Sequence, residues 1–491
     1  MIGKSGYPKA VLCIRAVSPI FCSNDLDALD EPVCLGRVIL NLMPMGPSHR
    51  DPPFVTRPTL GFTRSFSVLR KELDMGCLDY RTNRRAVLQA SLASILGFSM
   101  RDLIARAGTD SAASAEHVIF FWNGGGMSHI DTFDPKPGRP TKGDFDPIDT
   151  SVPGIQISQI FPEVAKVMEH CALVRSIAGV NGDHGRGTYQ LQTSYNASAN
   201  LIHPGFGSVV THEKTQIGDL PSYVTISGRA PKASYLGQKC EAYFIGGPGE
   251  KDPYLSFPEG IASTRGNQRL EVLEKFNGRF AEKSSNKELK STQTSIDEAL
   301  TLMRSPALAA FELDKVPTSQ LNRYGDTPFG RGCLVAKQLV ETGVRFVQVN
   351  RGGFDTHMNN FPAMEAHGEI MDPALASLIA DLAETGMLKK TLIVMLSEFG
   401  RTPKINKDSG RDHWPNVFTC FMAGGGIKGG TVIGSSDEDG YEPKDNPVKV
   451  SNLHASFCHA LGIDPDKKVM TPLQRPFKLI EDGTPIKELF A

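Results

Sequence analysis

Short apolar runs alternate with amphipathic stretches from residue 117 to the end of the chain. Six apolar runs predict buried strands: 117–122, 172–177, 223–226, 344–350, 391–396 and 417–422. Helical spacing of apolar residues predicts five helices: 161–170, 205–213, 332–342, 361–384 and 450–461. Apolar strands that alternate with helices are typical of a parallel sheet covered on both faces. The pattern therefore predicts an α/β fold with a central, mostly parallel sheet and helices on both sides.

Residues 265–310 interrupt this alternation. They are charged, poor in β-branched residues and helical in pattern, so we expect a helical insertion in one large α/β domain that spans residues 116–491. The formal net charge of −1 gives no indication of binding to nucleic acid or to an anionic membrane. No apolar run reaches the ~18 residues that a transmembrane anchor requires.

The segment before the first strand has the order of features found in an export signal. Arg84-Arg85 resembles the twin-arginine motif, a moderately apolar stretch follows over 86–100, and Ala113-Ser114-Ala115 matches a cleavage site. Ala105-Arg106-Ala107 is a rival cleavage site, and an amphipathic helix with a chance arginine pair is the alternative. We expect residues 75–115 to be a twin-arginine signal peptide and the protein to be exported, periplasmic or secreted.

A signal peptide stands at the start of a protein, yet 74 residues precede Met75. Residues 1–74 contain proline clusters and no sustained periodicity, so we interpret them as a misassigned gene start or as a disordered extension. Five cysteines follow Ala115 at wide spacings, and this odd, scattered set is no disulfide framework. The absence of any C-x-x-C excludes a zinc ribbon.

Polar clusters follow the predicted strands. They span residues 123–134, 183–188, 352–357 and 397–401, with a further group at 411–413. In parallel sheets the functional groups gather at the carboxyl ends of strands. Histidine and carboxylate side chains are the ligands of divalent metals, and arginine binds oxyanions through two hydrogen bonds. Each cluster also has a structural alternative as a tight turn, a helix cap or a surface loop.

Five segments together resemble the domain-of-unknown-function family 1501: GGGMSHIDTFDPKP, VPGIQISQIFPEVAKVMEHCALVRSI, GGFDTHMNN, LSEFGRTPKI and RDHWPNVF. This family consists of sulfatase-like proteins of the alkaline-phosphatase superfamily. The resemblance covers about residues 75–485. It implies an alkaline-phosphatase-like three-layer sandwich and the hydrolysis of phosphate or sulfate esters with one or two metal ions.

The resemblance also implies site residues, and the chain departs from the superfamily at several of them. Asn123 stands where the first metal carboxylate is expected, and the nearest carboxylates are Asp131 and Asp134. His184 stands at the position of the modified cysteine of sulfatases, so a formylglycine mechanism is not expected. Thr188 is then a displaced candidate nucleophile.

The implied metal ligands that remain are Asp355, His357 and His413, with Glu398 and Asp131 as further candidates. They would hold a divalent ion such as Zn, Ca or Mn. In the expected chemistry, His184 is a general acid or base or a further ligand. Two arginines, Arg186 and Arg401, would hold the phosphate or sulfate oxygens.

Three functions are compatible with these residues. The leading hypothesis is an exported metal-dependent hydrolase of phosphate or sulfate esters, with an ester or a sulfated polysaccharide as substrate. A non-catalytic protein that binds anions or sulfated glycans outside the cytoplasm is the second hypothesis, favoured by the missing ligands and nucleophile. An assembly factor for an envelope complex is the third.

Overall fold

The computed structural model describes residues 115–249, 255, 257, 260–261, 263–283 and 287–490. The chain divides into two units, residues 1–81 and 82–491, and every described residue belongs to the second. The expected extension at 1–74 and all but the last residue of the expected signal peptide lie outside the described residues. Within the described part of the chain, no helix is long and apolar enough to cross a membrane.

A nine-stranded sheet forms the centre of the second unit, in the order β12-β4-β11-β8-β1-β7-β5-β6, with β15 beside β4. The strands are β1 (His117–Asn123), β4 (Cys171–Ala178), β5 (Tyr223–Ile226), β6 (Tyr243–Ile245), β7 (Phe346–Arg351), β8 (Thr391–Leu396), β11 (Phe418–Ala423), β12 (Thr431–Ile433) and β15 (Val448–Lys449). Among them only β11 runs antiparallel to its neighbours, β8 and β4. The prediction of a mostly parallel sheet is confirmed.

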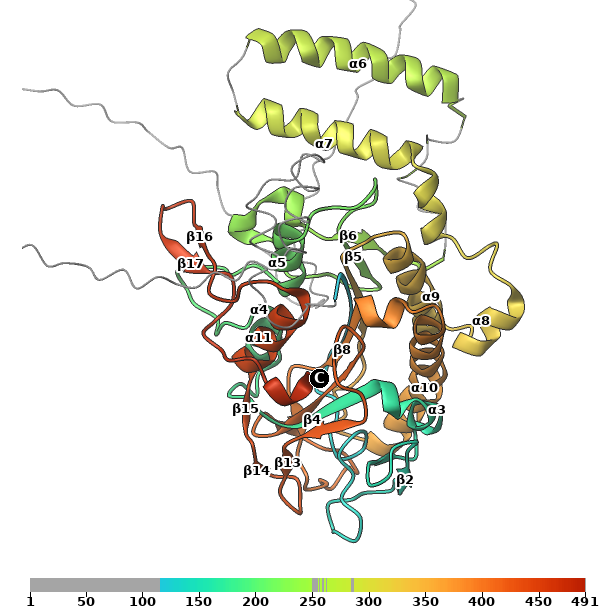
Figure 1. Ribbon diagram of the computed structural model, residues 1–491, viewed down its shortest axis with the longest axis vertical. Helices are drawn as coiled ribbons and strands as arrows, with labels where there is room; N and C mark the ends of the chain where they lie inside the picture. The colour runs from blue at the N-terminus through green and yellow to red at the C-terminus, as the bar shows by residue number, and fades with distance from the viewer. Residues whose placement is uncertain are drawn as a thin grey trace, which may run out of the picture. The chain divides into compact units, whose positions relative to one another are not determined.

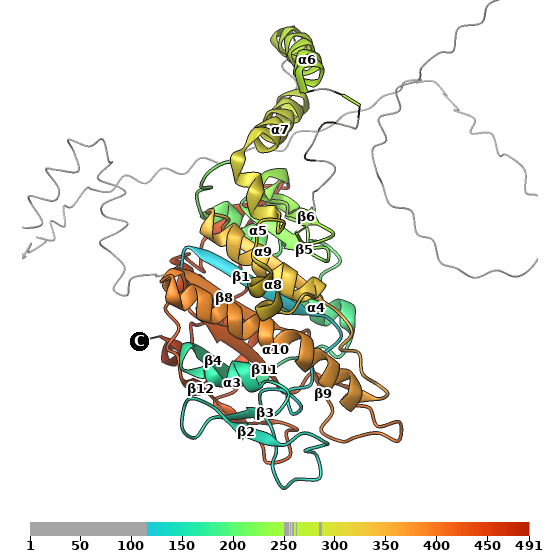
Figure 2. The ribbon, with the colours of Figure 1, turned by 90° about the vertical axis from the view of Figure 1, so that its right-hand side faces the viewer.

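Both faces of this sheet are covered by helices (Figures 1 and 2). The first layer contains α3 (Pro162–Lys166), α9 (Pro328–Glu341) and α10 (Asn360–Glu384), and the second contains α4 (His184–Thr193), α5 (Phe206–Glu213) and α11 (Val450–Leu461). Side chains alternate between the two faces of the sheet along β1. Ile119 and Phe121 pack against the first helical layer, and Val118 and Phe120 pack against the second. The predicted three-layer α/β sandwich is therefore confirmed.

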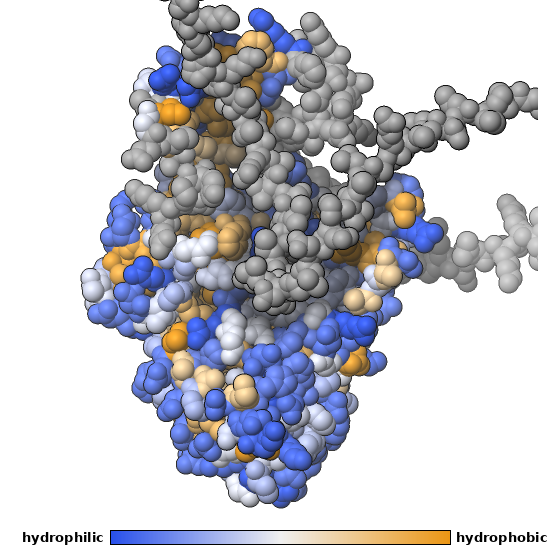
Figure 3. All heavy atoms as spheres, turned by 180° about the vertical axis from the view of Figure 1, so that it is seen from behind, coloured by the Kyte–Doolittle hydropathy of each residue, from blue (hydrophilic) through white to orange (hydrophobic). Residues whose placement is uncertain are grey.

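The charged stretch after β6 forms two long helices, α6 (Ser263–Lys283) and α7 (Lys287–Arg304). Figures 1 and 2 show them side by side beyond one end of the sheet. The chain returns to the first helical layer through η5 (Pro306–Phe311) and α8 (Thr318–Tyr324). Below these helices, the face seen in Figure 3 is largely hydrophilic, with apolar residues in small patches.

Shorter elements complete the described structure. Four two-stranded sheets pair β2 (Pro147–Asp149) with β3 (Gln156–Ser158), β9 (Gly400–Arg401) with β10 (His413–Trp414), β13 (Ser435–Ser436) with β14 (Pro443–Asp445), and β16 (Lys468–Met470) with β17 (Pro476–Lys478). Single 3₁₀ turns are η1 (Met168–His170), η2 (Ser234–Leu236), η3 (Gln238–Cys240), η6 (Met387–Lys390) and η7 (Lys487–Leu489). The β9–β10 pair is central to the site, because it joins two of the polar clusters.

Helix α4 was not predicted from the apolar pattern. Its sequence, HGRGTYQLQT, is mostly polar and contains two glycines. The helix begins because the Asp183 side chain accepts a hydrogen bond from the N–H of Arg186 at 3.0 Å, which caps the N-terminus. This local bond and the burial of Leu191 against the second layer override the weak periodicity.

Candidate metal centre

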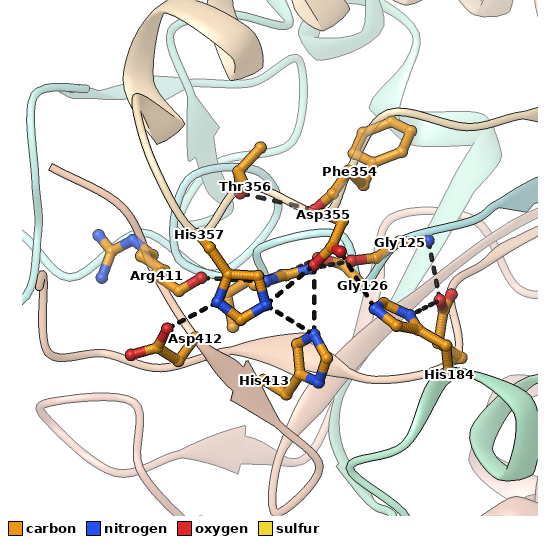
Figure 4. Close-up of polar contacts among 12 residues, drawn as sticks. Gly125, Gly126, His184, Phe354, Asp355, Thr356, His357, Arg411, Asp412 and His413 are labelled. Carbon is orange, nitrogen blue, oxygen red and sulfur yellow. Dashed lines mark hydrogen bonds and ion pairs between the residues drawn. The ribbon is translucent and has the colours of Figure 1, made fainter. Parts of the chain in front are cut away.

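Four polar clusters meet at one edge of the sheet (Figure 4). His184 begins α4 after β4, Asp355 follows β7, and Glu398 follows β8. These three strands run in the same direction, so their carboxyl ends lie at the same edge. His413 reaches this edge on β10, which pairs with β9 just after β8.

One aspartate lies at the centre of three imidazole rings. His184 Nε2 is 3.3 Å from Asp355 Oδ2, and His413 Nε2 is 3.2 Å from Asp355 Oδ1. His184, Asp355 and His413 each offer a ligand atom, and these atoms lie within 4.8 Å of one another. His357 adds a fourth donor, with its Nε2 3.2 Å from Asp355 Oδ1 and 3.0 Å from His413 Nε2.

The opposite nitrogen of each ring is hydrogen-bonded to an oxygen. His184 Nδ1 lies 2.7 Å from Glu398 Oε1, His357 Nδ1 lies 2.7 Å from Asp412 Oδ1, and His413 Nδ1 lies 2.8 Å from the Gly182 carbonyl oxygen. A carbonyl oxygen only accepts, so His413 Nδ1 carries the proton, and the carboxylates favour the same tautomer in the other two rings.

In these neutral tautomers the Nε2 atoms of all three rings carry lone pairs, and they converge on a carboxylate. The Nε2 lone pairs and the Asp355 carboxylate repel one another, and a cation bound between them would relieve this repulsion. Imidazole nitrogens with a second hydrogen bond to oxygen, together with a carboxylate, are the common ligand set of a transition metal. The residues present therefore fit a divalent metal ion.

Glu398 is not itself among the clustered ligands. Its side chain is 2% exposed, and its oxygens accept hydrogen bonds from the Gly125 N–H at 2.8 Å and from Ser397 Oγ at 3.0 Å. A carboxylate held in this way orients His184 from behind. In this structure Glu398 contacts His184 Nδ1 and lies outside the group of possible ligands formed by His184, Asp355 and His413.

The glycine run after β1 brings the backbone close to the site. Gly125 has φ +120°, and a Cβ there would lie 2.5 Å from the backbone nitrogen of Asp355. Only glycine combines this backbone conformation with such a close approach. Besides forming a turn, the run therefore lets the β1 loop and the Asp355 loop pack against each other.

Arg401 is fully buried and holds Asp355. Its Nη2 donates to Asp355 Oδ1 at 2.6 Å, Nε donates to the Gly126 carbonyl at 2.8 Å, and Nη1 donates to the Arg411 carbonyl at 3.0 Å. Burial by itself would raise the pKa of Asp355, but the hydrogen bond from Arg401 and the positive charge of that arginine lower the pKa to about 2. Arg401 keeps Asp355 ionised; it is not free to hold substrate oxygens as the sequence suggested.

Asp131, which we expected to be a metal ligand, is absent from the candidate ligand group of His184, Asp355 and His413. Arg411 Nε and Nη2 bind its two oxygens at 2.7 and 3.1 Å, and Asn360 Nδ2 and Ser128 Oγ donate to it at 2.9 and 2.6 Å. Both charged side chains are 0% exposed. The carboxylate oxygens are already satisfied, so Asp131 forms a buried ion pair that anchors the segment before His413.

The remaining candidates do not join the cluster. Thr188 lies on α4 one turn after His184, and Arg186 is exposed on the same helix. Among the described residues, no hydrogen bond or ion pair links either side chain to the metal centre. Asn123 is buried and donates to Met127 Sδ at 3.4 Å, so β1 contributes no carboxylate directly at its end.

Sequence reasoning missed two supporting groups. The role of Asp412 was signalled only by its place beside His413, and the Gly182 carbonyl has no side-chain signal at all. The side chains of the cluster itself are between 24% and 49% exposed, so solvent reaches the site.

A sequence profile described as "Protein of unknown function (DUF1501)" matches residues 115–490. No curated protein matches this sequence. A solved lipoteichoic acid synthase, LtaP from Listeria monocytogenes, is similar at 9% identity over 76% of this chain and 78% of its own, with a TM-score of 0.32.

Two further solved structures show a similarity of the same order. PsFucS1 sulfatase from Pseudoalteromonas sp. is 12% identical over 77% of this chain and 72% of its own, with a TM-score of 0.31. A mutant of TAB5 alkaline phosphatase is 11% identical over 72% of this chain and 99% of its own, with a TM-score of 0.31. Similarity at this level does not bear on the chemistry of the site.

Proposed function

We infer that this chain, which belongs to the DUF1501 family, is an exported metal-dependent hydrolase of phosphate or sulfate esters. The observation that carries this proposal is the convergence of three histidine Nε2 atoms on the ionised Asp355. Half-exposed side chains leave one side of this cluster open to solvent, as a catalytic metal requires.

The donor set narrows the choice of metal. Three imidazole nitrogens and one carboxylate suit zinc or manganese, whereas calcium takes six to eight oxygen ligands. We therefore favour Zn or Mn over Ca among the metals expected from the sequence. Such an ion, when bound, polarises an ester oxygen and lowers the pKa of a bound water towards ~7.

The protein's own residues would hold the metal ligands in place. Glu398 and Asp412 orient His184 and His357 through Nδ1, and Arg401 keeps Asp355 charged. Carboxylates behind ligating histidines fix the tautomer and increase the basicity of the ring. Among the described residues, no hydroxyl or thiol is hydrogen-bonded to His184, Asp355 or His413. This supports attack by water and argues against Thr188 as the nucleophile.

Metal analysis tests the proposal directly. We expect about one zinc or manganese ion per purified chain and hydrolysis of aryl phosphates or aryl sulfates that a chelator abolishes. His413→Ala should remove the metal, while His212→Ala, at an exposed histidine paired with Glu213, should not. A protein without metal and without metal-stimulated hydrolysis would contradict the assignment.

The competing hypothesis is a protein that has the same fold and binds anions or sulfated glycans but does not catalyse hydrolysis. Among the described residues no nucleophile is hydrogen-bonded to the cluster, which would suit a protein that binds anions or sulfated glycans without hydrolysing them. Metal bound in stoichiometric amount, together with binding of sulfated glycans and no turnover, would favour this alternative.

Export through the twin-arginine route remains part of the proposal and rests on Arg84-Arg85 and the small-residue cleavage sites. Mass spectrometry of the native N-terminus tests it. A chain that begins at or after residue 105 in the periplasm or medium supports export, and peptides from residues 1–74 would show that Met75 is not the start.

A further inference from the structure

The hairpin β16–β17 carries an exposed apolar tip. Leu473, in its turn, is 77% exposed and is the most exposed large hydrophobic side chain of the described residues. Met470, at the end of β16, is 54% exposed. Figure 1 shows this hairpin projecting from the body of the protein.

The register of the hairpin explains why these side chains face outward. Val469 pairs with Phe477, and Val469 packs against the core of the second helical layer. Successive side chains of a strand point to opposite faces, so Met470 points away from the body when Val469 points towards it. The inner face therefore anchors the hairpin and the outer face is free.

The segment 467–478 is cationic and contains no acidic residue. Lys467 pairs with Glu213, and Lys478 pairs with two aspartates at the base of the hairpin. Lys468 and Arg475 are exposed and form no ion pair in the part of the chain that the structure describes. Two unpaired cations thus flank the apolar tip.

A neighbouring loop extends the same surface. Ile202 is 60% exposed, and the ring of the next residue, His203, lies 6.0 Å from the Phe477 ring. Tyr195, stacked on His203 at 3.9 Å, donates a hydrogen bond to the Lys478 carbonyl at 3.0 Å. These contacts join the loop that carries Ile202 to the base of the hairpin.

We propose that this docking hairpin, residues 467–478, binds the surface of an anionic lipid bilayer. Leu473 and Met470 enter the boundary between headgroups and acyl chains, and Lys468 and Arg475 bind lipid phosphates. Exposed apolar side chains ringed by unpaired cations are typical of interfacial membrane binding. A sulfated glycan would use the cations but would leave the two apolar side chains in water.

Cosedimentation of the full chain with vesicles tests the proposal. We expect binding to phosphatidylglycerol–phosphatidylcholine vesicles, and weaker binding in high salt because exposed charges are screened. The double variant M470D/L473D should bind about tenfold more weakly or worse, since two apolar groups lose their burial. K468E/R475E should lose binding to anionic vesicles to a similar extent.

Phe276→Asp, an exposed apolar position on α6, is the matched control and should bind like the unchanged protein. Equal binding of M470D/L473D and unchanged protein would overturn the proposal, as would retention on dextran sulfate with no binding to vesicles. The proposal stands apart from hydrolysis. Metal content and turnover of a soluble aryl ester should be the same in all three variants.

Discussion

Two aspartates, each bound by a fully buried arginine, have opposite roles in this molecule. Asp131 pairs with Arg411, is 0% exposed and has both oxygens occupied by donors. Asp355 pairs with Arg401, but its side chain is 49% exposed and faces three histidine nitrogens. The other neighbours of Asp131 are hydrogen-bond donors, whereas the histidine nitrogens that face Asp355 are acceptors. This difference separates a structural ion pair from a candidate metal ligand.

The largest expected effect is a loss of stability when the buried Asp131–Arg411 ion pair is broken. Asp131→Asn leaves the Arg411 charge buried without a counterion, so we expect the free energy of unfolding to fall by about 3–5 kcal/mol. Urea denaturation measures this loss. Asp146→Asn, which breaks an exposed pair with Lys142, should cost less than about 1 kcal/mol. If both variants lost the same free energy of unfolding, the buried ion pair would contribute no more stability than the exposed one.

Asp355→Asn should act on metal rather than on the fold. Removal of the central carboxylate should weaken zinc or manganese binding by more than about 100-fold, beyond the effect of losing a group behind a ligand. The apoprotein should lose less unfolding free energy than Asp131→Asn does. Competition with a fluorescent chelator measures the affinity. Metal affinity that persists in this variant would remove Asp355 from the site.

A substitution of Glu398 tests whether a buried carboxylate strengthens metal binding without being a direct ligand. Glu398→Gln keeps an acceptor near His184 Nδ1 but removes the charge, so metal affinity should fall by about 10–100-fold. The exposed Glu369→Gln on α10 is the control and should leave affinity unchanged. Complete loss of metal, equal to that in Asp355→Asn, would instead make Glu398 a direct ligand.

The smallest expected effect is on acid stability. The pKa of Asp355 in the folded apoprotein is lowered to about 2, below the ordinary value of 3.8. The ionised form therefore adds stability above about pH 4, and this contribution is lost as the pH falls towards 2. Half exposure reduces it to about 1 kcal/mol. The difference in unfolding free energy between the apo forms of wild type and Asp355→Asn should shrink over that range.

The sequence predicted the sheet well because its strands are buried on both faces. β8 (Thr391–Leu396) has no exposed residue, and its apolar run matches the strand. Helix α4 was not predicted because its sequence has no apolar stripe. The helix begins at the N-terminal cap formed by the Asp183 side chain. The approach of His184 to Asp355 also depends on strand order, which periodicity does not specify.

The grouping of the candidate site residues depends on tertiary structure in the same way. The family resemblance suggested Asp355, His357 and His413 as metal ligands, and the structure places these side chains beside His184. Spacing alone treats Asp131 and Asp355 alike, since both stand in polar loops after strands. Only the three-dimensional neighbours show that Arg411 and Asn360 already satisfy Asp131.

The position of β1 at the centre of the sheet has a consequence for synthesis. His117 Nδ1 is hydrogen-bonded to the Val344 carbonyl oxygen across 227 residues, and β1 lies between β7 and β8 in the sheet. At about 5–20 residues per second, a ribosome takes roughly 10–45 s to make the intervening chain. During that time the five apolar residues Val118–Trp122 have no strand partner, so we expect the nascent protein to need protection from aggregation until β7 and β8 are made.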